Sequence, residues 1–298
     1  MRAQTIPHKK GYDNMLDTYA LSSFKADPIS EVEHRLVSEF IESTAGIQMP
    51  ASKRTLIETR LRKRQRLLGF NNLRDYINFA LKDLEGASER QNLLDALTTN
   101  KTDFYREDAH FLFLKAYLDK HRYHSKDPLK IWSAGCSSGE EPYTLSIEML
   151  EIQRQYPSFD FRITATDISS KCLDKARIAI YPHEKVEPIE LALRQRYLLR
   201  SKDPSKNIVK IAPEARAPVK FNYFNLITGD WRNWQAHFDV IFCRNVMIYF
   251  NNLDRSLLTE RFYNALKQGG ILMIGHSESL IDNTGLFERL QPTIYRKL

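Results

Sequence analysis

A glycine turn that leads into two acidic residues is the feature of the sequence that most clearly indicates ligand binding. A short apolar run at residues 129–134 ends at Gly135, and small residues then lead to Gly139 and the acid pair Glu140-Glu141, followed by a proline. Proline suits the first turn of a helix, where its missing N–H costs no hydrogen bond, and glycine permits a tight turn. The order predicts a strand, a turn and a helix start, the place where nucleotide-like ligands bind open α/β sheets.

Four interpretations of this turn compete. The dinucleotide fingerprint G-x-G-x-x-G requires glycines where Ser137 and Glu140 stand, and an acid pair would repel a pyrophosphate, so NAD and ATP are disfavoured. Gly135, Ser137 and Gly139 match the G-x-S-x-G of hydrolases, but that motif follows several strands, whereas the chain before residue 129 has a helical pattern. S-adenosylmethionine carries a positive centre and ribose hydroxyls, which acids suit. A helix-capping turn with solvated acids stays open as well.

Polar residues also follow three other predicted strands. Asp167 ends the second strand, where a carboxylate can accept both ribose hydroxyls, although a strand-end aspartate can equally cap a helix. Arg244 and Asn245 end the fourth strand, at the expected ligand crevice, and Asn225-Leu226 follow the third strand, placed to reach an adenine. Val-Met-Ile-Tyr follows Asn245 instead of the two prolines and aromatic residue of enzymes that methylate base or amide nitrogens. This difference argues against nucleic-acid amino groups as the substrate.

Alternating strand and helix patterns predict an α/β fold with a parallel sheet covered by helices on both faces. Residues 181–218 interrupt the alternation, are rich in Pro, Lys and Arg, and contain the strand-like segment 208–211, so they predict a small antiparallel insertion, with a long loop as the alternative. The expected elements are strand 129–134, helix 142–155, strand 161–166, helix 170–180, strands 219–224 and 240–243, helix 254–266, strand 271–274 and a terminal hairpin within 283–298.

The chain before the sheet has a helical pattern. Residues 1–27 are expected to form a flexible tail, residues 28–98 an all-α domain, residues 99–127 a linker with a connecting helix, and residues 128–298 the α/β domain. Phe104 and Tyr105 predict that the linker is packed against something. The expected helices of the all-α domain begin at a Ser30/Glu33 capping box, with Gly46 ending the first helix, and continue at 51–68, 71–84 and 88–97, the last with a Ser88/Gln91 cap.

The helix expected at 51–68 carries the strongest charge feature of the chain. So many cations on one short helix repel one another unless an acidic partner compensates them, although most such runs are simply solvated faces. Nucleic acid and acidic helices are both possible partners. The cations are Lys53, Arg54, Arg60, Arg62, Lys63, Arg64 and Arg66.

Composition narrows the class of protein. The 298 residues, 42% of them hydrophobic and 27% charged, predict a globular protein with one large or two ordinary domains, and the formal net charge of +7 favours acidic partners. Three scattered cysteines favour reduced thiols in the cytosol, and the sequence has no metal-binding Cys or His pattern. Because no apolar run is long enough for a signal core or a membrane span, a cytoplasmic protein is expected.

With these segments the chain resembles the chemoreceptor glutamate O-methyltransferase (CheR-type) family from about Ser30 to the C-terminus. The resemblance rests on the helical N-terminal part and on four motifs, TTNKTDFYRE at 98–107, GEEPY at 139–143, CRNVMIYF at 243–250 and GHSE at 275–278. It implies a Rossmann-like S-adenosylmethionine-dependent methyltransferase domain with a small β-subdomain insertion, after an all-α bundle. Such enzymes methylate glutamate side chains on the helical cytoplasmic rods of bacterial chemoreceptors for sensory adaptation in chemotaxis, and they release S-adenosylhomocysteine.

The resemblance also implies the site. Arg106 and Tyr249 would lie near the transferred methyl group, and the seven cations of the basic helix would face the receptor. The insertion is expected to be the β-subdomain that binds a receptor tail peptide in some members, but residues 200–204 lack the glycines used for this. A monomer without metal, nucleic-acid partner or membrane insertion is expected. The implied cofactor site is Asn100, Thr102, Arg106, Glu141, Asp167, Asn225, Leu226, Arg244 and Asn245, together with Gly135 of the turn.

Two other classes stay open from the residues alone. One is a methyltransferase that acts on another acidic protein or on nucleic acid, and the other is a binding module that senses S-adenosylmethionine without turning it over.

Overall fold

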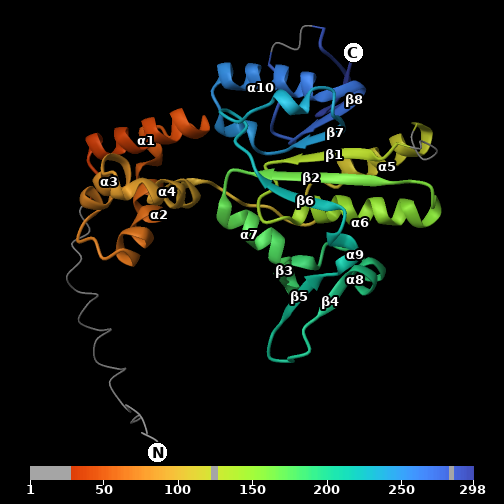
Figure 1. Cartoon of the computed structure of the whole chain (residues 1–298), viewed down its shortest axis with the longest axis horizontal. Helices are drawn as coiled ribbons and strands as arrows, with labels where there is room; N and C mark the ends of the chain where they lie inside the picture. The colour runs from red at the N-terminus through yellow and green to blue at the C-terminus, as the bar shows by residue number, and fades with distance from the viewer. Residues whose placement is uncertain (1–27, 122–126, 282–284) are drawn as a thin grey trace, which may run out of the picture.

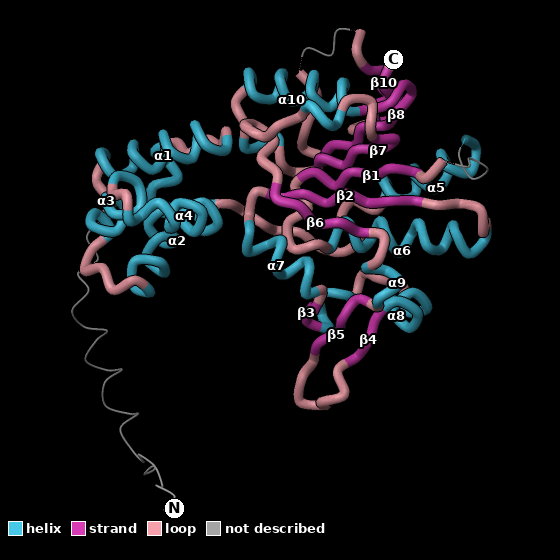
Figure 2. Tube along the Cα trace, viewed as in Figure 1, coloured by secondary structure: helices cyan, strands magenta, loops and turns pink. Residues whose placement is uncertain are grey.

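The computed structural model describes residues 28–121, 127–281 and 285–298, and the expected tail at residues 1–27 lies outside them. A helical N-terminal bundle, a large α/β domain and a small β-subdomain make up the described chain (Figure 1). The strands are confined to the last two parts (Figure 2). No helix in the described ranges combines the length and the apolar character that crossing a membrane requires.

A seven-stranded sheet in the order β6-β2-β1-β7-β8-β10-β9 forms the centre of the α/β domain. β1 pairs in parallel with β2 on one side and with β7 on the other, so the strand order reverses at β1. This confirms the expected α/β fold and places a ligand crevice at the carboxyl end of β1. The parallel strands are β1 (Leu129–Ala134), β2 (Phe161–Asp167), β6 (Val219–Tyr223), β7 (Phe238–Cys243) and β8 (Leu266–Ile274). At the edge, β10 (Ile294–Lys297) runs antiparallel to β8 and forms a hairpin with β9 (Phe287–Gln291).

Helices cover both faces of this sheet because successive strand residues point to opposite sides. Ile131 belongs to the core that includes residues of α5 and α6, whereas Trp132 belongs to the core that includes residues of α10. α6 begins at Glu140, two residues before the expected start, because Gly139 adopts the left-handed conformation (φ +99°) that ends the turn. The helices are α5 (Ala109–His121), α6 (Glu140–Gln155), α7 (Ser170–Ile178) and α10 (Asn252–Ala265).

The insertion is an antiparallel three-stranded sheet in the order β3-β5-β4, as expected. α7 ends two residues earlier than expected because Ala179 adopts the left-handed conformation (φ 56°), so Ile180 opens β3 instead of continuing the helix. The elements of the insertion are β3 (Ile180–Pro182), η3 (His183–Val186), α8 (Leu191–Tyr197), β4 (Leu198–Arg200), β5 (Ile208–Ile211) and α9 (Pro213–Arg216).

Four helices form the N-terminal bundle around a separate apolar core that includes Ile41, Leu61 and Tyr76. The expected capping box of Ser30 and Glu33 starts the first helix, and Gly46 ends it with φ +71°. The expected Ser88 cap is wrong, because a 3₁₀ turn at Glu85–Ser88 leads directly into the fourth helix and the Ser88 side chain makes no capping bond. The helices are α1 (Glu31–Ala45), α2 (Arg54–Leu67), α3 (Leu73–Lys82) and α4 (Glu89–Leu97), with a further 3₁₀ turn at Ala51–Lys53.

Candidate functional site

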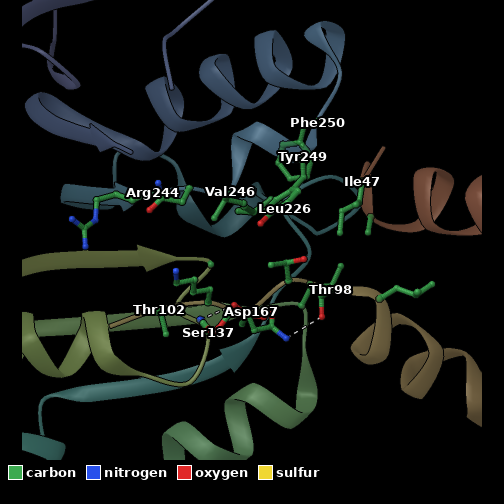
Figure 3. A pocket seen from close by; sticks show the side chains of 18 of the residues that line it. Ile47, Thr98, Thr102, Ser137, Asp167, Leu226, Arg244, Val246, Tyr249 and Phe250 are labelled. Atoms are coloured by element: carbon green, nitrogen blue, oxygen red, sulfur yellow. Dashed lines mark hydrogen bonds between the residues drawn. The ribbon is translucent and has the colours of Figure 1, made fainter. Parts of the chain in front are cut away.

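A cavity of about 250 Å³ lies where the carboxyl ends of β1, β2 and β7 face the N-terminal bundle (Figure 3). Segments far apart in the chain form its walls: the end of α1, the linker after α4, the turn after β1, and the segments after β2, β6 and β7. The structure brings together all ten residues expected at the cofactor site, as well as Lys53 and Tyr249. The ten are Asn100, Thr102, Arg106, Gly135, Glu141, Asp167, Asn225, Leu226, Arg244 and Asn245.

The turn after β1 is held against the end of β2 by the Asp167 carboxylate. The backbone N–H groups of Ser137 and Ser169 donate to its two oxygens, each at 2.8 Å. Burial raises the pKa of Asp167, while these two backbone donors act against that rise. Gly135 has φ +83°, and a Cβ there would lie 2.5 Å from Val246 Cγ2, so no larger residue fits this turn. Asp167 therefore shapes the pocket as well as lining it.

The two acidic residues after Gly139 lie in different environments, and only the second of them lines the pocket. Glu141 lines the pocket and accepts hydrogen bonds from Ser133 Oγ at 2.6 Å and from Arg244 Nε at 2.7 Å. Glu140 lies outside the pocket lining, accepts from Ser138 Oγ at 2.8 Å, and has a pKa raised by burial. Adjacent helix residues point about 100° apart, so only one of two neighbouring acids can face a given ligand.

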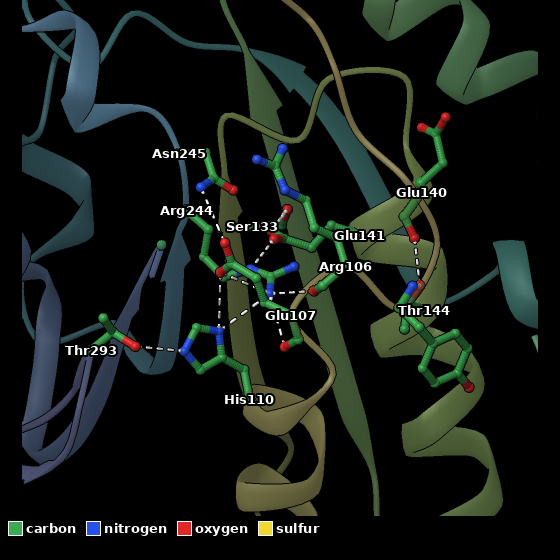
Figure 4. A network of polar contacts seen from close by, with 12 residues as sticks. Arg106, Glu107, His110, Ser133, Glu140, Glu141, Thr144, Arg244, Asn245 and Thr293 are labelled. Carbon is green, nitrogen blue, oxygen red and sulfur yellow. Dashed lines mark hydrogen bonds and ion pairs between the residues drawn. The ribbon is translucent and has the colours of Figure 1, made fainter. Parts of the chain in front are cut away.

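Arg244 is the centre of a buried polar network that joins the end of β7 to the linker (Figure 4). Its Nη1 donates to the Arg106 carbonyl at 2.6 Å and lies 3.6 Å from Glu107 Oε2, and only 2% of its side chain is exposed. The neighbouring Asn245 Nδ2 donates to Glu107 Oε1 at 3.2 Å. Arg244 thus holds the linker, and with it Arg106, against the sheet.

Glu107, His110 and His276 lie close enough together to suggest a metal site. Both ring nitrogens of His110 are already engaged, however: Arg244 Nη1 is 3.2 Å from Nδ1, and Thr293 Oγ1 is 2.9 Å from Nε2. A metal ion here would also meet the positive guanidinium of Arg244. The cluster is therefore a structural hydrogen-bonded network.

Arg106 and Tyr249, the expected catalytic pair, both line the pocket. Arg106 Nη1 donates to the Lys101 carbonyl at 2.9 Å, which curls the linker around the arginine. The Tyr249 carbonyl accepts from the backbone N–H of Gln48 at 2.9 Å, and Lys53 Nζ lies 5.8 Å from the centre of the Tyr249 ring. The bundle therefore positions the tyrosine and adds a lysine beside it.

The bundle also contributes an apolar wall that sequence reasoning missed. Ile47 and Met49 follow α1 with no motif to mark them, and they reach the pocket only because the bundle docks on the α/β domain. Asn225 helps to fix this docking: its Nδ2 donates to the Thr44 carbonyl at 2.6 Å, while its Oδ1 accepts from the backbone N–H groups of Ile227 and Thr228. Asn225 was expected to reach an adenine, but its side-chain amide contacts the bundle.

Two family models match separate parts of the chain. The model for the CheR methyltransferase SAM binding domain matches residues 100–296, and the model for the CheR methyltransferase all-alpha domain matches residues 33–98. The chain belongs to the CheR methyltransferase family. The chemotaxis protein methyltransferase of Klebsiella aerogenes is 36% identical over 268 residues, covering 90% of each chain. Chemotaxis protein methyltransferase 2 of Pseudomonas aeruginosa is 38% identical, covering 87% of this chain and 90% of the relative.

The lining of the pocket suits S-adenosylmethionine, the cofactor of a CheR methyltransferase. Asp167 and Glu141 offer carboxylates to ribose hydroxyls and to a positively charged ligand, whereas Phe224 and Leu226 offer apolar surface to an adenine ring. Ser137 and Asp167 lie on one side of the pocket and Tyr249 on the other (Figure 3). An anionic pyrophosphate would meet the two carboxylates unfavourably, which agrees with the absence of the dinucleotide fingerprint.

The basic helix of this CheR protein is not a uniform cationic face. Arg60 Nη1 donates to the carbonyls of Leu97 and Thr98 at 2.6 and 3.0 Å, and Arg64 donates through Nε and Nη2 to the two carboxylate oxygens of Glu89 at 2.8 and 2.6 Å. The expectation that these two arginines face a partner is wrong, because they tie α2 to α4. The remaining five cations lie differently: Lys63 and Arg66 are exposed, Arg62 is half-buried, Arg54 lies 3.8 Å from Glu31, and Lys53 Nζ donates to the Gln48 carbonyl.

His110 is expected to make this CheR protein less stable in acid. Burial and the nearby charge of Arg244 lower its pKa from 6.5 to about 4, with Glu107 acting against this and His276 adding to it. The unfolded chain therefore binds a proton below pH 6.5 that the folded chain takes up only near pH 4, so stability falls as pH falls through this window. Between pH 7.5 and pH 5, the free energy of unfolding, measured with urea, should fall by up to about 2 kcal/mol more for the wild type than for His110→Gln. An equal fall in the free energy of unfolding of both proteins would contradict the assignment of this pH dependence to His110.

Proposed function

We propose that this protein transfers the methyl group of S-adenosylmethionine to glutamate side chains of chemoreceptors in the cytoplasm, giving glutamyl methyl esters. The observation that carries the proposal is the composition of one pocket: Asp167 and Glu141 line it together with Arg106, Lys53 and Tyr249. The carboxylates suit a cationic methyl donor, and the cations suit an anionic methyl acceptor. A pocket built for a neutral amine acceptor would have no need of cationic side chains such as those of Arg106 and Lys53.

The chemistry of the proposed reaction requires little beyond positioning. S-adenosylmethionine supplies the methyl group on a positively charged sulfur. A glutamate carboxylate is already ionised at neutral pH, so no general base is needed. The opposite charges of donor and acceptor diminish as the reaction proceeds, so water stabilises the reactants more than the transition state. Excluding water and aligning the carboxylate oxygen with the methyl group should therefore provide most of the rate.

The lining residues have distinct roles in this proposal. Arg106, which lines the pocket on a linker that Arg244 holds in place, orients the acceptor carboxylate through a charge-assisted hydrogen bond. Tyr249 covers the reacting end and, with Ile47 and Phe250, keeps water out. Lys53 adds a positive charge beside Tyr249, on the turn that leads into α2.

The experiment that tests the proposal is methyl transfer from labelled S-adenosylmethionine to a purified receptor cytoplasmic fragment, followed by mild alkali. Label that appears on the fragment and is released as methanol by alkali supports a glutamyl ester. Label that resists alkali would mean a different acceptor group. Cofactor binding without transfer to any receptor fragment would mean that the protein senses S-adenosylmethionine.

The exposed cations of α2 should govern receptor affinity. The double charge reversal Lys63→Glu/Arg66→Glu is expected to raise KM for the receptor fragment about tenfold, because like charges then face an acidic partner, and to leave the Kd for S-adenosylmethionine unchanged. Raising the salt concentration should reduce the difference in this KM between the variant and the wild type, because salt screens charges on the surface. The control Lys120→Glu/Lys220→Glu makes the same change in net charge on exposed residues of the α/β domain. Equal effects of the two variants would argue against a receptor-binding role for α2.

A further inference from the structure

The insertion contacts the back of the cofactor pocket through its first strand. Tyr181, the central residue of β3, is buried, and its hydroxyl donates to the Ser138 carbonyl at 2.7 Å. Ser138 lies in the turn after β1, next to Ser137, which lines the pocket. A residue of the insertion is therefore hydrogen-bonded to the turn that we assign to the cofactor.

The contact of Tyr181 with the turn is close and specific. A Cβ at Gly139 would lie 2.9 Å from the Tyr181 hydroxyl oxygen, so the tyrosine fits against the bare backbone of the glycine. Burial raises the pKa of Tyr181, and the nearby Glu140 raises it further, so its hydroxyl remains a hydrogen-bond donor at any physiological pH. The Tyr181 ring also packs edge-on against Phe104 of the linker, with the ring centres 5.1 Å apart.

Lys185, four residues further along, holds the same linker. Its Nζ donates to Asp103 Oδ1 at 2.6 Å and to the Thr102 carbonyl at 3.3 Å. Thr102 lines the pocket, whereas neither Tyr181 nor Lys185 does. The insertion therefore contacts both the turn and the linker, two walls of the pocket that are far apart in sequence.

We propose that Tyr181 and Lys185 are positioning residues for the cofactor: they hold the turn and the linker in the geometry that binds S-adenosylmethionine. The inference rests on the proposed cofactor pocket. It gives the insertion a role in cofactor affinity that is separate from any contact between the insertion and a receptor. Because both residues act through others, their replacement should change cofactor affinity with little effect on the chemical step.

Tyr181→Phe removes only the hydroxyl, and Tyr197→Phe is its matched control. Tyr197 is also buried in the insertion and donates its hydroxyl to Glu151 Oε1 on α6, away from the pocket lining. Loss of one buried hydrogen bond should lower the melting temperature of both variants. Only Tyr181→Phe should raise the Kd for S-adenosylmethionine, measured calorimetrically, by roughly three- to tenfold, since one hydrogen bond is worth about 1 kcal/mol.

Lys185→Met tests the second contact, with Lys206→Met as its control. Lys206 pairs with Asp203 at 3.6 Å within the insertion and lies outside the cofactor pocket. We expect Lys185→Met to raise KM for S-adenosylmethionine several-fold, with kcat and the KM for the receptor fragment within about twofold of the wild type.

The outcomes separate this inference from the proposed function. A wild type that binds no S-adenosylmethionine would overturn the cofactor pocket itself. If the wild type binds S-adenosylmethionine and both Tyr181→Phe and Lys185→Met bind it as tightly as the wild type does, the assignment of the pocket is kept and the positioning role is refuted. The same refutation follows if Tyr197→Phe weakens cofactor binding as much as Tyr181→Phe, because a general loss of stability would then explain both.

Discussion

Replacing Arg244 with methionine is expected to lower the free energy of unfolding by about 3–5 kcal/mol, because removing one partner of a buried ion pair leaves the other charge uncompensated. Arg244 lies 2.7 Å from Glu141 and also donates to the carbonyl of Arg106 in the linker. Methionine retains an apolar side chain of similar reach, so the change mainly removes the charge. Urea unfolding of the wild type and the variant at neutral pH measures the difference.

Two further variants sharpen this test. Arg232→Met removes an arginine that pairs with Asp230 at 2.6 Å but is 88% exposed, so it should change the free energy of unfolding far less than Arg244→Met does. Adding Glu141→Gln to Arg244→Met should restore part of the lost stability, since the buried carboxylate is then neutral. If Arg244→Met lowered the free energy of unfolding no more than Arg232→Met does, the buried network would not exist as described.

Replacing Arg106 with alanine is expected to lower kcat for receptor methylation about 100-fold or more, because the acceptor carboxylate loses the group that orients it. The Kd for S-adenosylmethionine should change much less than kcat, since Asp167 and the turn remain. Tyr249→Phe removes only the hydroxyl and should lower kcat by roughly tenfold. Steady-state kinetics with the labelled cofactor and calorimetric binding measure the two effects separately.

The control for Arg106 is an arginine distant from the pocket. Arg162→Ala removes an exposed side chain that pairs with Asp160 at 2.6 Å, and it should leave kcat and cofactor affinity unchanged. Wild-type turnover and cofactor affinity in both Arg106→Ala and Tyr249→Phe would remove these residues from the mechanism. A parallel loss of melting temperature and activity in Arg106→Ala would assign it a structural role in the linker.

The N-terminal bundle has two roles in this structure. Ile47 and Met49, after α1, line the proposed cofactor pocket, and α2 presents Lys63 and Arg66 to solvent. Asp95 of α4 also fixes the bundle, because it accepts hydrogen bonds from the backbone N–H and the hydroxyl of Ser170 at the start of α7. A receptor bound by α2 would thus be bound by the same helical bundle that lines one side of the pocket.

The sequence by itself determined the features that depend on local patterns. Alternating apolar runs predict the parallel sheet, and the carboxyl ends of its neighbouring strands necessarily meet, so the strand pattern was enough to assign Gly135, Asp167 and Arg244 to one crevice. The Ser30 capping box and Gly46 depend on bonds within a few residues, and both are confirmed. These predictions required only chain order and periodicity.

Only the tertiary structure decided which side chains face the pocket and which are used elsewhere. Glu140 and Glu141 have the same local pattern, but only Glu141 reaches the ligand side. Arg60 and Arg64 point into the bundle because acceptors from α4 and the linker lie beside them, and α4 begins some twenty-five residues later in the chain. Tyr181 belongs to no sequence motif that would mark its contact with the turn after β1. Contacts between distant segments depend on how helices and sheets dock, and that docking is the sum of many weak packing terms that no local pattern records.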